Sequence, residues 1–499
     1  MDLGRALAQP PNDSSHESAQ KTELNRPSRI EMIPLEILTR IFIICRDDVW
    51  IRDDNQDPEE DDGDENKIDP ESIFDPRVAP MLLGRVCPSF REAALQTPLL
   101  WDSVTFTTYD LVSTGRLPGI QTILARSGNL PLTISFSSPS TRSDQAVLEN
   151  GRAQFLQRIW EFHPRFKHLK FDISRTDVQL DSLPAPTTLQ LLRSLDISII
   201  GKSETSPSLP AFLRVFEDAP LLRSLTLYDT SPLDATSHIF HPDFFPWRQL
   251  TKLTSSISVT TTTARDILRH CRGLEICELG NLESEDILHQ PPLCILNQMR
   301  SLNLSTTGDL LFIGFFDSLA FPRLENLTLD GFAVPGDSLL ELHGRSQCQI
   351  KCLAMDTLRL TADEIIRLLR LMPSLPMFSL ANSHCAGNIF EALTYCGDST
   401  AASLVLPNLK ELAVGENADF LSWTNDPAVD DGGDGIAVVE MAESLQRYPG
   451  PQNGCLPSLR SVQLHLAGPK FAPALEARLA AVCTTGCIVD HCVNERYGE

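Results

Sequence analysis

The residues best suited to hold a metal gather near the end of the sequence. Cys483, Cys487, His491 and Cys492 combine thiols and an imidazole at short spacing, which are the ligand types of a tetrahedral zinc site. The two-residue spacing within a cysteine pair, which structural zinc sites use, is missing. A final strand over residues 487–489 with incidental thiols explains the same residues. We therefore expect no metal.

Two adjacent histidine–cysteine pairs, His270-Cys271 and His384-Cys385, offer a nucleophile next to a base. Each pair falls where a helix end or a loop is expected, so neither indicates a catalytic centre. The sequence has no glycine-rich phosphate loop and no G-x-S-x-G turn. These observations predict a protein that is not an enzyme, with no catalytic residues and no cofactor.

An acidic run between Asp53 and Glu65 could attract calcium or a basic partner. It lacks the alternating ligands and the glycine of a calcium-binding loop. Its density of like charges and its lack of apolar residues are typical of a solvated, disordered spacer. We interpret residues 46–77 as such an insert.

The charge balance limits the possible partners. The chain of 499 residues carries 66 acidic and 42 basic residues, a formal net charge of −24, which argues against nucleic acid and against an anionic membrane surface. Residues 1–21 contain no apolar core of signal-peptide length. The sequence also contains no run of about 18 apolar residues, the length needed to span a bilayer. The 13 cysteines then indicate reduced thiols in the cytoplasm, the nucleus or both.

Stepping through the N-terminal part, we expect a disordered tail over residues 1–28 and short helices after it. Residues 33–42 carry Pro34 at the expected helix start and place apolar side chains at three- and four-residue spacing on more than one face. Further helices are expected over 80–87 and 90–95, followed by the apolar plug at Trp101. Alternating strands near Val104 and Leu132 flank a helix over 120–125, and we assign residues 111–165 to a connecting segment.

From residue 166 onward one pattern recurs. Apolar residues at positions i, i+3 and i+5 start at Phe166 and return after 26, 30, 28, 24, 25, 25, 26 and 25 residues, and then after 34 and 50. A period near 25 with L-x-x-L-x-L spacing is typical of leucine-rich repeats. Such units bury their apolar edges only against their neighbours, so they stack into a curved solenoid with a parallel sheet. The partial copy at Leu250 has Ser255 in its third apolar position, and an acidic loop over 426–436 accounts for the longest step.

The residue between the two inward positions of each strand should face outward. These residues form the candidate substrate face: Thr226, Glu278, Asn303, Thr328, Ala354, Ser379 and Gln463. The set mixes small and polar side chains and contains no basic stripe and no aromatic cage. It favours a protein surface as the ligand.

The N-terminal pattern resembles an F-box. The stretch Ile33-Pro34-Leu35-Glu36-Ile37-Leu38 is similar to the opening of that motif. Val86-Cys87-Pro88-Ser89-Phe90-Arg91 and Thr97-Pro98-Leu99-Leu100-Trp101 are similar to its close. Together with Arg126-Ser127-Gly128 and Pro246-Trp247, the chain resembles fungal F-box-like proteins with degenerate leucine-rich repeats. The long insert, Pro88 in place of a basic residue and Phe90 in place of tryptophan depart from the family pattern.

This resemblance implies a fold and a function. The fold is α/β: a small all-α F-box-like head over 29–110, followed by a curved leucine-rich-repeat-like solenoid over 166–499. The function is that of a substrate-recognition adaptor in a Skp–cullin–F-box ubiquitin ligase, with an unknown target protein on the repeats. The positions implied to dock the Skp-type adaptor of the cullin–RING core are Pro34, Leu35, Ile37, Leu38, Ile41, Val86, Cys87 and Phe90. The alternative is a non-catalytic scaffold in which the F-box-like region only caps the solenoid.

Overall fold

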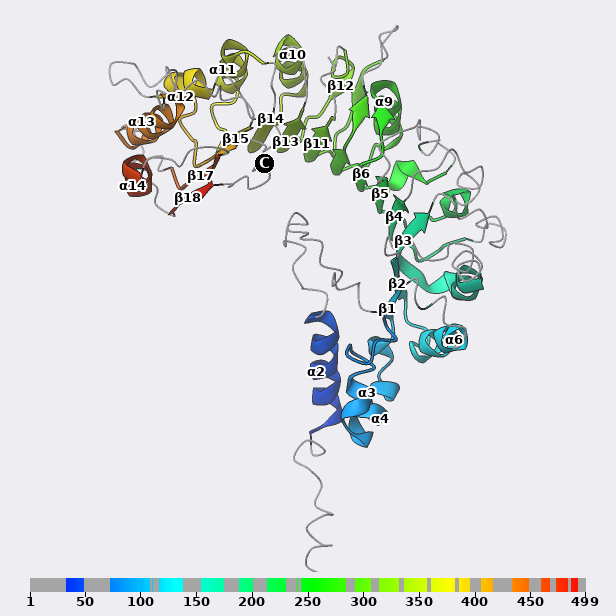
Figure 1. The fold of residues 1–499 in the computed structure, drawn as a ribbon. Helices are drawn as coiled ribbons and strands as arrows, with labels where there is room; N and C mark the ends of the chain where they lie inside the picture. The colour runs from blue at the N-terminus through cyan, green and yellow to red at the C-terminus, as the bar shows by residue number, and fades with distance from the viewer. Residues whose placement is uncertain are drawn as a thin grey trace, which may run out of the picture. The chain divides into compact units, whose positions relative to one another are not determined.

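The computed structural model describes most of the chain between residues 33 and 491. The described ranges are 33–48, 72–107, 110, 116–137, 154–174, 188–200, 213–229, 240, 244–283, 292–306, 314–331, 336–356, 360–381, 386–394, 405–415, 433–447, 459–466, 473–482 and 486–491. The chain is mixed α/β with a large parallel sheet (Figure 1). It divides into two compact units, Met1–Ser143 and Asp144–Glu499.

The first unit begins with short helices. They are α2 (Leu35–Asp48), α3 (Leu83–Val86), α4 (Pro88–Gln96) and the 3₁₀ turn η2 (Pro98–Leu100). Pro88 opens α4 where its missing N–H costs nothing, and the Cys87 sulfur accepts a hydrogen bond from Phe90 N at 3.5 Å. Trp101 is buried as expected, and its indole N–H donates to the Ala94 carbonyl at 2.9 Å.

The first unit is not all-α. Strand β1 (Ser103–Thr107) pairs in parallel with β2 (Leu132–Ser137), and α6 (Leu117–Arg126) connects them. The inward residues Val104, Phe106, Ile134 and Phe136 are buried, so the alternating pattern that indicated strands also supplies the core. The expectation of an all-α head ending at residue 110 is therefore wrong, and residues 111–143 belong to the same compact unit.

The boundaries of the acidic insert also need correction. Helix α2 continues to Asp48. In its last turn, the Arg46 guanidinium pairs with the Asp102 carboxylate at 2.7 Å. Residues 72–77 are ordered against β1, because Ile73 is buried and its N–H donates to the Thr105 carbonyl at 2.9 Å. Only 49–71 of the expected insert lie outside the described residues, as does the tail over 1–28.

The second helix of this unit is also shorter than expected. Of the residues 80–87, only Leu83–Val86 form α3. Turns occupy the positions before α3, and the Leu82 N–H donates a hydrogen bond to the Val78 carbonyl at 2.8 Å.

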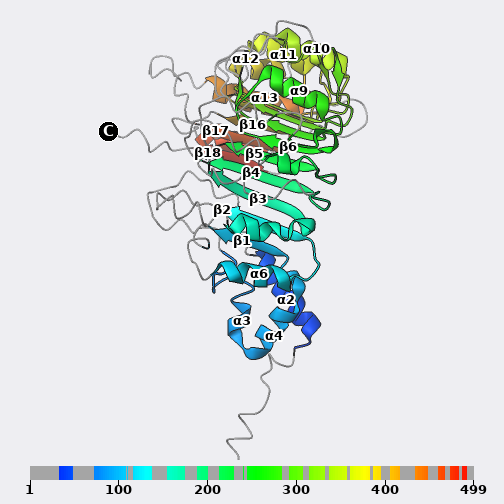
Figure 2. The ribbon, with the colours of Figure 1, turned by 90° about the vertical axis from the view of Figure 1, so that its right-hand side faces the viewer.

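The second unit is built on strands that follow one another in sequence order. They are β3 (Phe166–Ser174), β4 (Ser194–Ile200), β5 (Ser224–Asp229), β6 (Lys252–Ser255), β8 (Ile276–Leu279), β11 (Ser301–Ser305), β13 (Asn326–Asp330), β14 (Cys352–Asp356), β15 (Met377–Ala381), β16 (Glu411–Gly415), β17 (Ser461–Leu466) and β18 (Gly486–His491). Every adjacent pair is parallel. Within this unit the strands line the inner side of an arc (Figures 1 and 2).

The recurring apolar residues form the core of this unit. The i+3 and i+5 residues of successive strands are buried, for example Leu225 and Leu227 beside Leu195 and Ile197. Ser255 occupies the same inward position in β6 and is also buried. Its hydroxyl accepts a hydrogen bond from Ile257 N at 3.1 Å, which satisfies the polar group inside the core.

The outer layer of the second unit consists of helices and short turns. The helices are α9 (Thr261–His270), α10 (Gly336–Ser346), α11 (Ala362–Arg370), α12 (Ala386–Leu393), α13 (Gly433–Arg447) and α14 (Pro473–Val482). The one-turn elements are η3 (His163–Arg165), η5 (Arg214–Phe216) and η7 (Trp247–Gln249). Two parallel strand pairs, β7 (Val259–Thr260) with β9 (Leu282–Glu283) and β10 (Cys294–Ile295) with β12 (Leu319–Ala320), were not expected.

The expected acidic loop over 426–436 overlaps a helix. Helix α13 begins at Gly433, and its residues Ala437, Val438 and Val439 are buried. Residues 416–432 lie outside the described part of the chain. Among the described helices, none has both the length and the apolar character required to cross a membrane.

Candidate protein-interaction surfaces

Helix α2 presents an apolar stripe at its surface. Ile37, Ile41 and Ile44 lie at positions i, i+4 and i+7, so they share one face of the helix. Their side chains are 48%, 41% and 57% exposed. Large apolar side chains gathered on one helix face are typical of a surface that a partner covers.

The opposite face of α2 belongs to the core of the first unit. Leu38 and Phe42 are 5% and 0% exposed, and the Phe42 ring meets the Phe90 ring edge-on at 5.1 Å. Thr39 and Thr97 approach through their hydroxyls at 3.4 Å. The helix is therefore held by one apolar face while the α2 stripe stays accessible.

The structure divides the residues expected to dock a ligase adaptor into two groups. Pro34, Leu35, Ile37, Ile41 and Val86 are exposed. Leu38 is buried, and Cys87 and Phe90 are half-buried, where they cap α4 and contact Phe42. The second group can act only by positioning the first.

Other exposed apolar residues of the first unit were not among the predicted docking positions. They are Ile44, Leu82, Leu95 and Leu99. Ile44 continues the three- and four-residue spacing of Ile37 and Ile41, so helical periodicity places it on the same face as these two residues.

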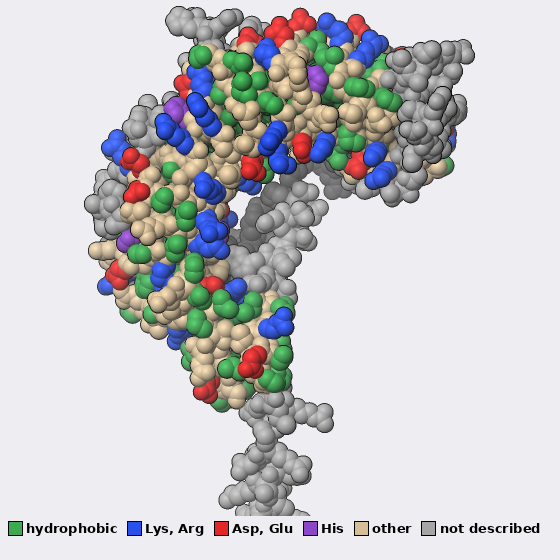
Figure 3. Space-filling model, turned by 180° about the vertical axis from the view of Figure 1, so that it is seen from behind, with side chains coloured by type: hydrophobic (Ala, Val, Ile, Leu, Met, Phe, Trp, Pro, Cys, Tyr) green, Lys and Arg blue, Asp and Glu red, His purple; other side chains and the backbone are tan. Residues whose placement is uncertain are grey.

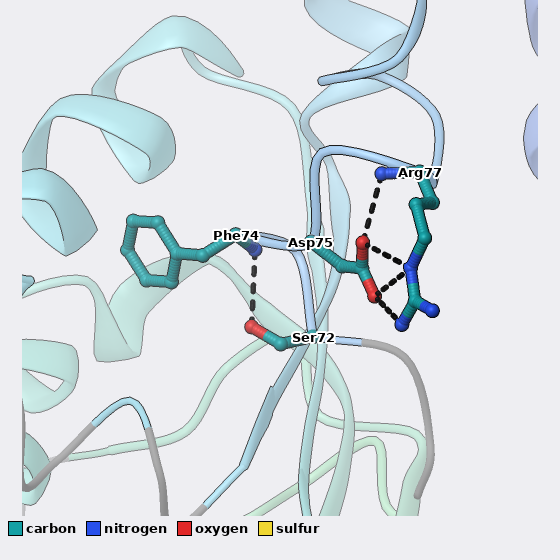
Figure 4. Close-up of polar contacts among 4 residues, drawn as sticks. All are labelled: Ser72, Phe74, Asp75 and Arg77. Carbon is teal, nitrogen blue, oxygen red and sulfur yellow. Dashed lines mark hydrogen bonds and ion pairs between the residues drawn. The ribbon is translucent and has the colours of Figure 1, made fainter. Parts of the chain in front are cut away.

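Polar contacts fix the segment that precedes α3. The Asp75 carboxylate accepts from the Arg77 guanidinium at 2.7 to 3.2 Å, and Ser72 Oγ accepts from Phe74 N at 3.0 Å (Figure 4). The bonds from Arg77 hold the pKa of Asp75 below its ordinary value. Ser72 Oγ also donates to the fully buried Asp110 carboxylate at 2.6 Å, which joins this segment to the end of β1.

The second surface is the exposed side of the parallel sheet. The structure brings all the predicted face residues into one row, which we call the outward row. Cross-strand register joins, in order, Asp196, Thr226, Thr254, Glu278, Asn303, Thr328, Ala354, Ser379, Ala413 and Gln463. Asp196, Thr254 and Ala413 were not predicted, and the constant i+4 position within the repeat could have identified them.

The outward row is polar and partly bonded within itself. Thr254 Oγ1 donates to Glu278 Oε2 at 3.1 Å. Tyr228, which lies beyond the row on β5, is 46% exposed. Burial, assisted by the charges of Asp196 and Glu278, raises the pKa of the Tyr228 phenol, so it remains a hydrogen-bond donor at neutral pH.

The buried thiols of Cys271 and Cys277 do not suit nucleophilic chemistry. Cys271 follows the last residue of α9, and burial raises its pKa to about 12. Burial also raises the pKa of Cys277, so both thiols stay protonated. His270 Nδ1 lies 2.7 Å from the Asp266 carbonyl oxygen of its own helix, which is not a catalytic group.

The described residues contain no cluster of three potential metal ligands. The expected final strand is present as β18, whereas Cys483, Cys492 and the His384-Cys385 pair lie outside the described residues.

Comparison with known proteins adds no assignment. No protein-family model matches the chain, and a search of curated proteins also found no match. The α2 stripe, the outward row and the sequence patterns that form them are therefore the basis for proposing a function.

Proposed function

We propose that this chain is a substrate-recognition adaptor of a Skp–cullin–F-box type ubiquitin ligase. The first unit docks the Skp-type adaptor as an F-box does, and the second unit holds a target protein as a leucine-rich-repeat solenoid does. The observation that carries the proposal is the two-faced helix α2. One face packs on Phe90 through Phe42, and the other exposes Ile37, Ile41 and Ile44.

The energetics favour a partner on this stripe. Fully burying a side chain of this size is worth about 1.5–3 kcal/mol relative to leaving it in water. Three such residues on one helical face could anchor a helix-in-groove interface. A scaffold in which the first unit only caps the solenoid has no use for this exposed stripe, so we favour docking.

The target-binding half of the proposal rests on the outward row. Its side chains are small, polar and aligned across strands, and the described residues give it no metal cluster. Such a surface can supply hydrogen bonds along an extended contact but no evident reaction chemistry. We infer that the protein acts by binding and is not an enzyme.

The test is capture of a Skp-type adaptor by the full-length chain. The variant Ile37→Ala plus Ile41→Ala should weaken binding by about tenfold or more, because it removes two exposed anchors without touching the core. The matched control is Leu191→Ala plus Leu221→Ala, which removes two comparably exposed apolar side chains from the second unit. If the stripe variant binds like the control, or if the unaltered chain binds no adaptor, the ligase proposal is wrong.

A further inference from the structure

A row of mainly basic residues follows the margin of the sheet where its strands begin. We define this leading row as the residue directly before each strand of the large sheet from β4 to β17, together with Lys167, the second residue of β3. Its members are Lys167, Arg193, Arg223, Thr251, Glu275, Arg300, Glu325, Lys351, Pro376, Lys410 and Arg460. The proposed function depends on the α2 stripe and the outward row and not on this row.

Backbone hydrogen bonds make the members of the leading row neighbours in space. Arg193 N donates to the Lys167 carbonyl at 2.8 Å, and Arg223 N donates to the Arg193 carbonyl at 2.9 Å. The same ladder runs on to Arg460 N, which donates to the Lys410 carbonyl at 2.6 Å. Adjacent strands are about 4.8 Å apart, so the side chains of the row are presented at that spacing.

The row is basic on a chain that is strongly acidic. The net charge of the chain is −24, yet lysine and arginine dominate at this one position of the repeat. Figure 3 shows Lys and Arg side chains recurring along the inner side of the arc formed by the second unit. Chance placement would not concentrate the minority charge on one margin of the sheet.

The middle of the row is internally compensated. Glu325 contacts Lys351 at 3.0 Å and Arg300 at 3.9 Å, so these three charges largely satisfy one another. Glu275 interrupts the row on the other side of Arg300. Among the described residues, the longest run of cations in the row that no other member interrupts is therefore at the β3–β5 end.

Three consecutive cations form that group: Lys167, Arg193 and Arg223. The two arginines are exposed, and Arg223 Nη1 donates to the Gln249 carbonyl at 2.8 Å. Burial, followed by the charges of Lys167 and Arg193 and opposed by Asp196, lowers the pKa of the neighbouring His168. Like charges side by side across strands are unfavourable unless an anion offsets them.

We propose that Lys167, Arg193 and Arg223 bind an acidic, extended segment of a partner protein. The proposal rests on the proposed function of the second unit as a target-binding surface, and it specifies the chemistry of the target. Carboxylates of such a segment would lie against the three cations while its chain continues over the outward row. Electrostatic contacts of this kind set orientation and association rate as well as affinity.

The form of the group favours a protein segment over a nucleic acid. The cationic group is short, because the neutral Thr251 follows it in the leading row and Glu275, which would repel a continuing polyanion, comes next. Neither the leading row nor the residues that directly follow it include a phenylalanine, tyrosine or tryptophan on which bases could stack. The large negative charge of the rest of the chain also opposes a long polyanion.

The experiment measures binding of a short labelled peptide of alternating Glu and Ser to the full-length chain at low salt, by fluorescence anisotropy. Arg193→Glu plus Arg223→Glu should weaken binding by about tenfold, because two attractive contacts become repulsive. Arg367→Glu plus Arg370→Glu changes the net charge equally, but on exposed positions of α11, and should change binding little. Arg193→Gln plus Arg223→Gln, which retains hydrogen-bond donors, should give an intermediate loss in a chain with an unchanged unfolding transition.

Three outcomes would overturn the proposal. They are no peptide binding by the unaltered chain, equal loss in both charge-reversal variants, and tighter binding of a thymidine oligonucleotide with the same dependence on Arg193 and Arg223. Adaptor capture through the α2 stripe is measured on the same variants. If adaptor capture persists while peptide binding fails, only the cationic-group proposal is wrong. If peptide binding persists while adaptor capture fails, only the ligase proposal is wrong.

Discussion

At the scale of single residues, Asp110 shows how a buried charge organises the first unit. Its side chain is 0% exposed. It accepts hydrogen bonds from Ser72 Oγ at 2.6 Å, Thr107 N at 2.8 Å and Arg116 Nη1 at 2.5 Å. A buried carboxylate is tolerated only when it is satisfied in this way.

Replacing Asp110 with alanine should therefore be costly. We expect Asp110→Ala to lower the free energy of unfolding by about 1–3 kcal/mol, because the buried Thr107 N–H and the Ser72 hydroxyl lose their acceptor. Urea denaturation of the full-length chain, followed by tryptophan fluorescence, measures this. Trp101 lies in the same unit and is buried, so it reports on the right transition.

Asp75→Ala is the matched control for this prediction. Asp75 also pairs with an arginine, but the Arg77 side chain is 79% exposed, and such surface pairs contribute at most about 1 kcal/mol. Equal losses for the two variants would show that burial of Asp110 has no energetic consequence.

At the scale of elements, helix ends are specified by local sequence. Helix α11 begins with a capping box, in which Thr361 Oγ1 accepts from Glu364 N at 3.3 Å and Glu364 Oε2 accepts from Thr361 N at 2.9 Å. The bond from Thr361 N holds the pKa of Glu364 below its ordinary value.

The cap leads to a prediction at this scale. Thr361→Ala should lower the free energy of unfolding by about 1 kcal/mol, because the first turn of α11 loses an acceptor for its free N–H groups. Thr361→Ser keeps the hydroxyl and should change stability little. Thermal unfolding of both variants measures the difference, and a serine variant as unstable as the alanine variant would exclude capping as the cause.

Helix α2 illustrates what element-level reasoning can reach. The sequence predicted apolar residues on more than one face of a short helix, and both faces are present. Which face packs inward could not be read from spacing, because Leu38 and Ile37 are equally apolar neighbours. The position of Phe90 decides it, since its ring contacts Phe42 and leaves the isoleucines outside.

At the scale of the whole molecule, each inner strand of the second unit pairs only with the one before and the one after it in the repeat series. Strand β14 pairs with β13 and β15, and Leu353 aligns with Leu327 and Phe378. Stability in such an arrangement is approximately a sum of nearest-neighbour contributions. Local damage should therefore spread first to adjacent strands.

Leu353→Ala tests this expectation. The residue is fully buried, and its truncation should cost about 2–5 kcal/mol. Hydrogen exchange should show the largest loss of amide protection in β13, β14 and β15. The control Ser379→Ala changes an outward residue and should leave exchange unchanged within about 0.5 kcal/mol. A uniform loss of protection across the second unit would contradict a nearest-neighbour arrangement.

The repeat pattern alone was enough to predict the strands of the second unit and their inward residues. Apolar residues at i+3 and i+5, returning with a period near 25, can be buried together only if the strands stack in parallel, so the order of the strands follows from the order of the repeats. The outward row follows from the same alternation, although its role in target binding stays a prediction. The acidic insert was predicted from composition, and its core over 49–71 lies outside the described residues. Its predicted ends were wrong, because Arg46 and Ile73 contact partners far away in the sequence.

Which surfaces are exposed, and which charged residues lie side by side, could be seen only in the folded structure. Lys167, Arg193 and Arg223 lie 26 to 30 residues apart along the chain and look like scattered charges in the sequence. Parallel pairing brings them to adjacent strands, where their fields add. The same is true of Asp110, whose burial depends on Ser72 and Arg116 meeting at the end of β1. Local spacing specifies the elements, whereas burial and electrostatics depend on distances that exist only after the chain has folded.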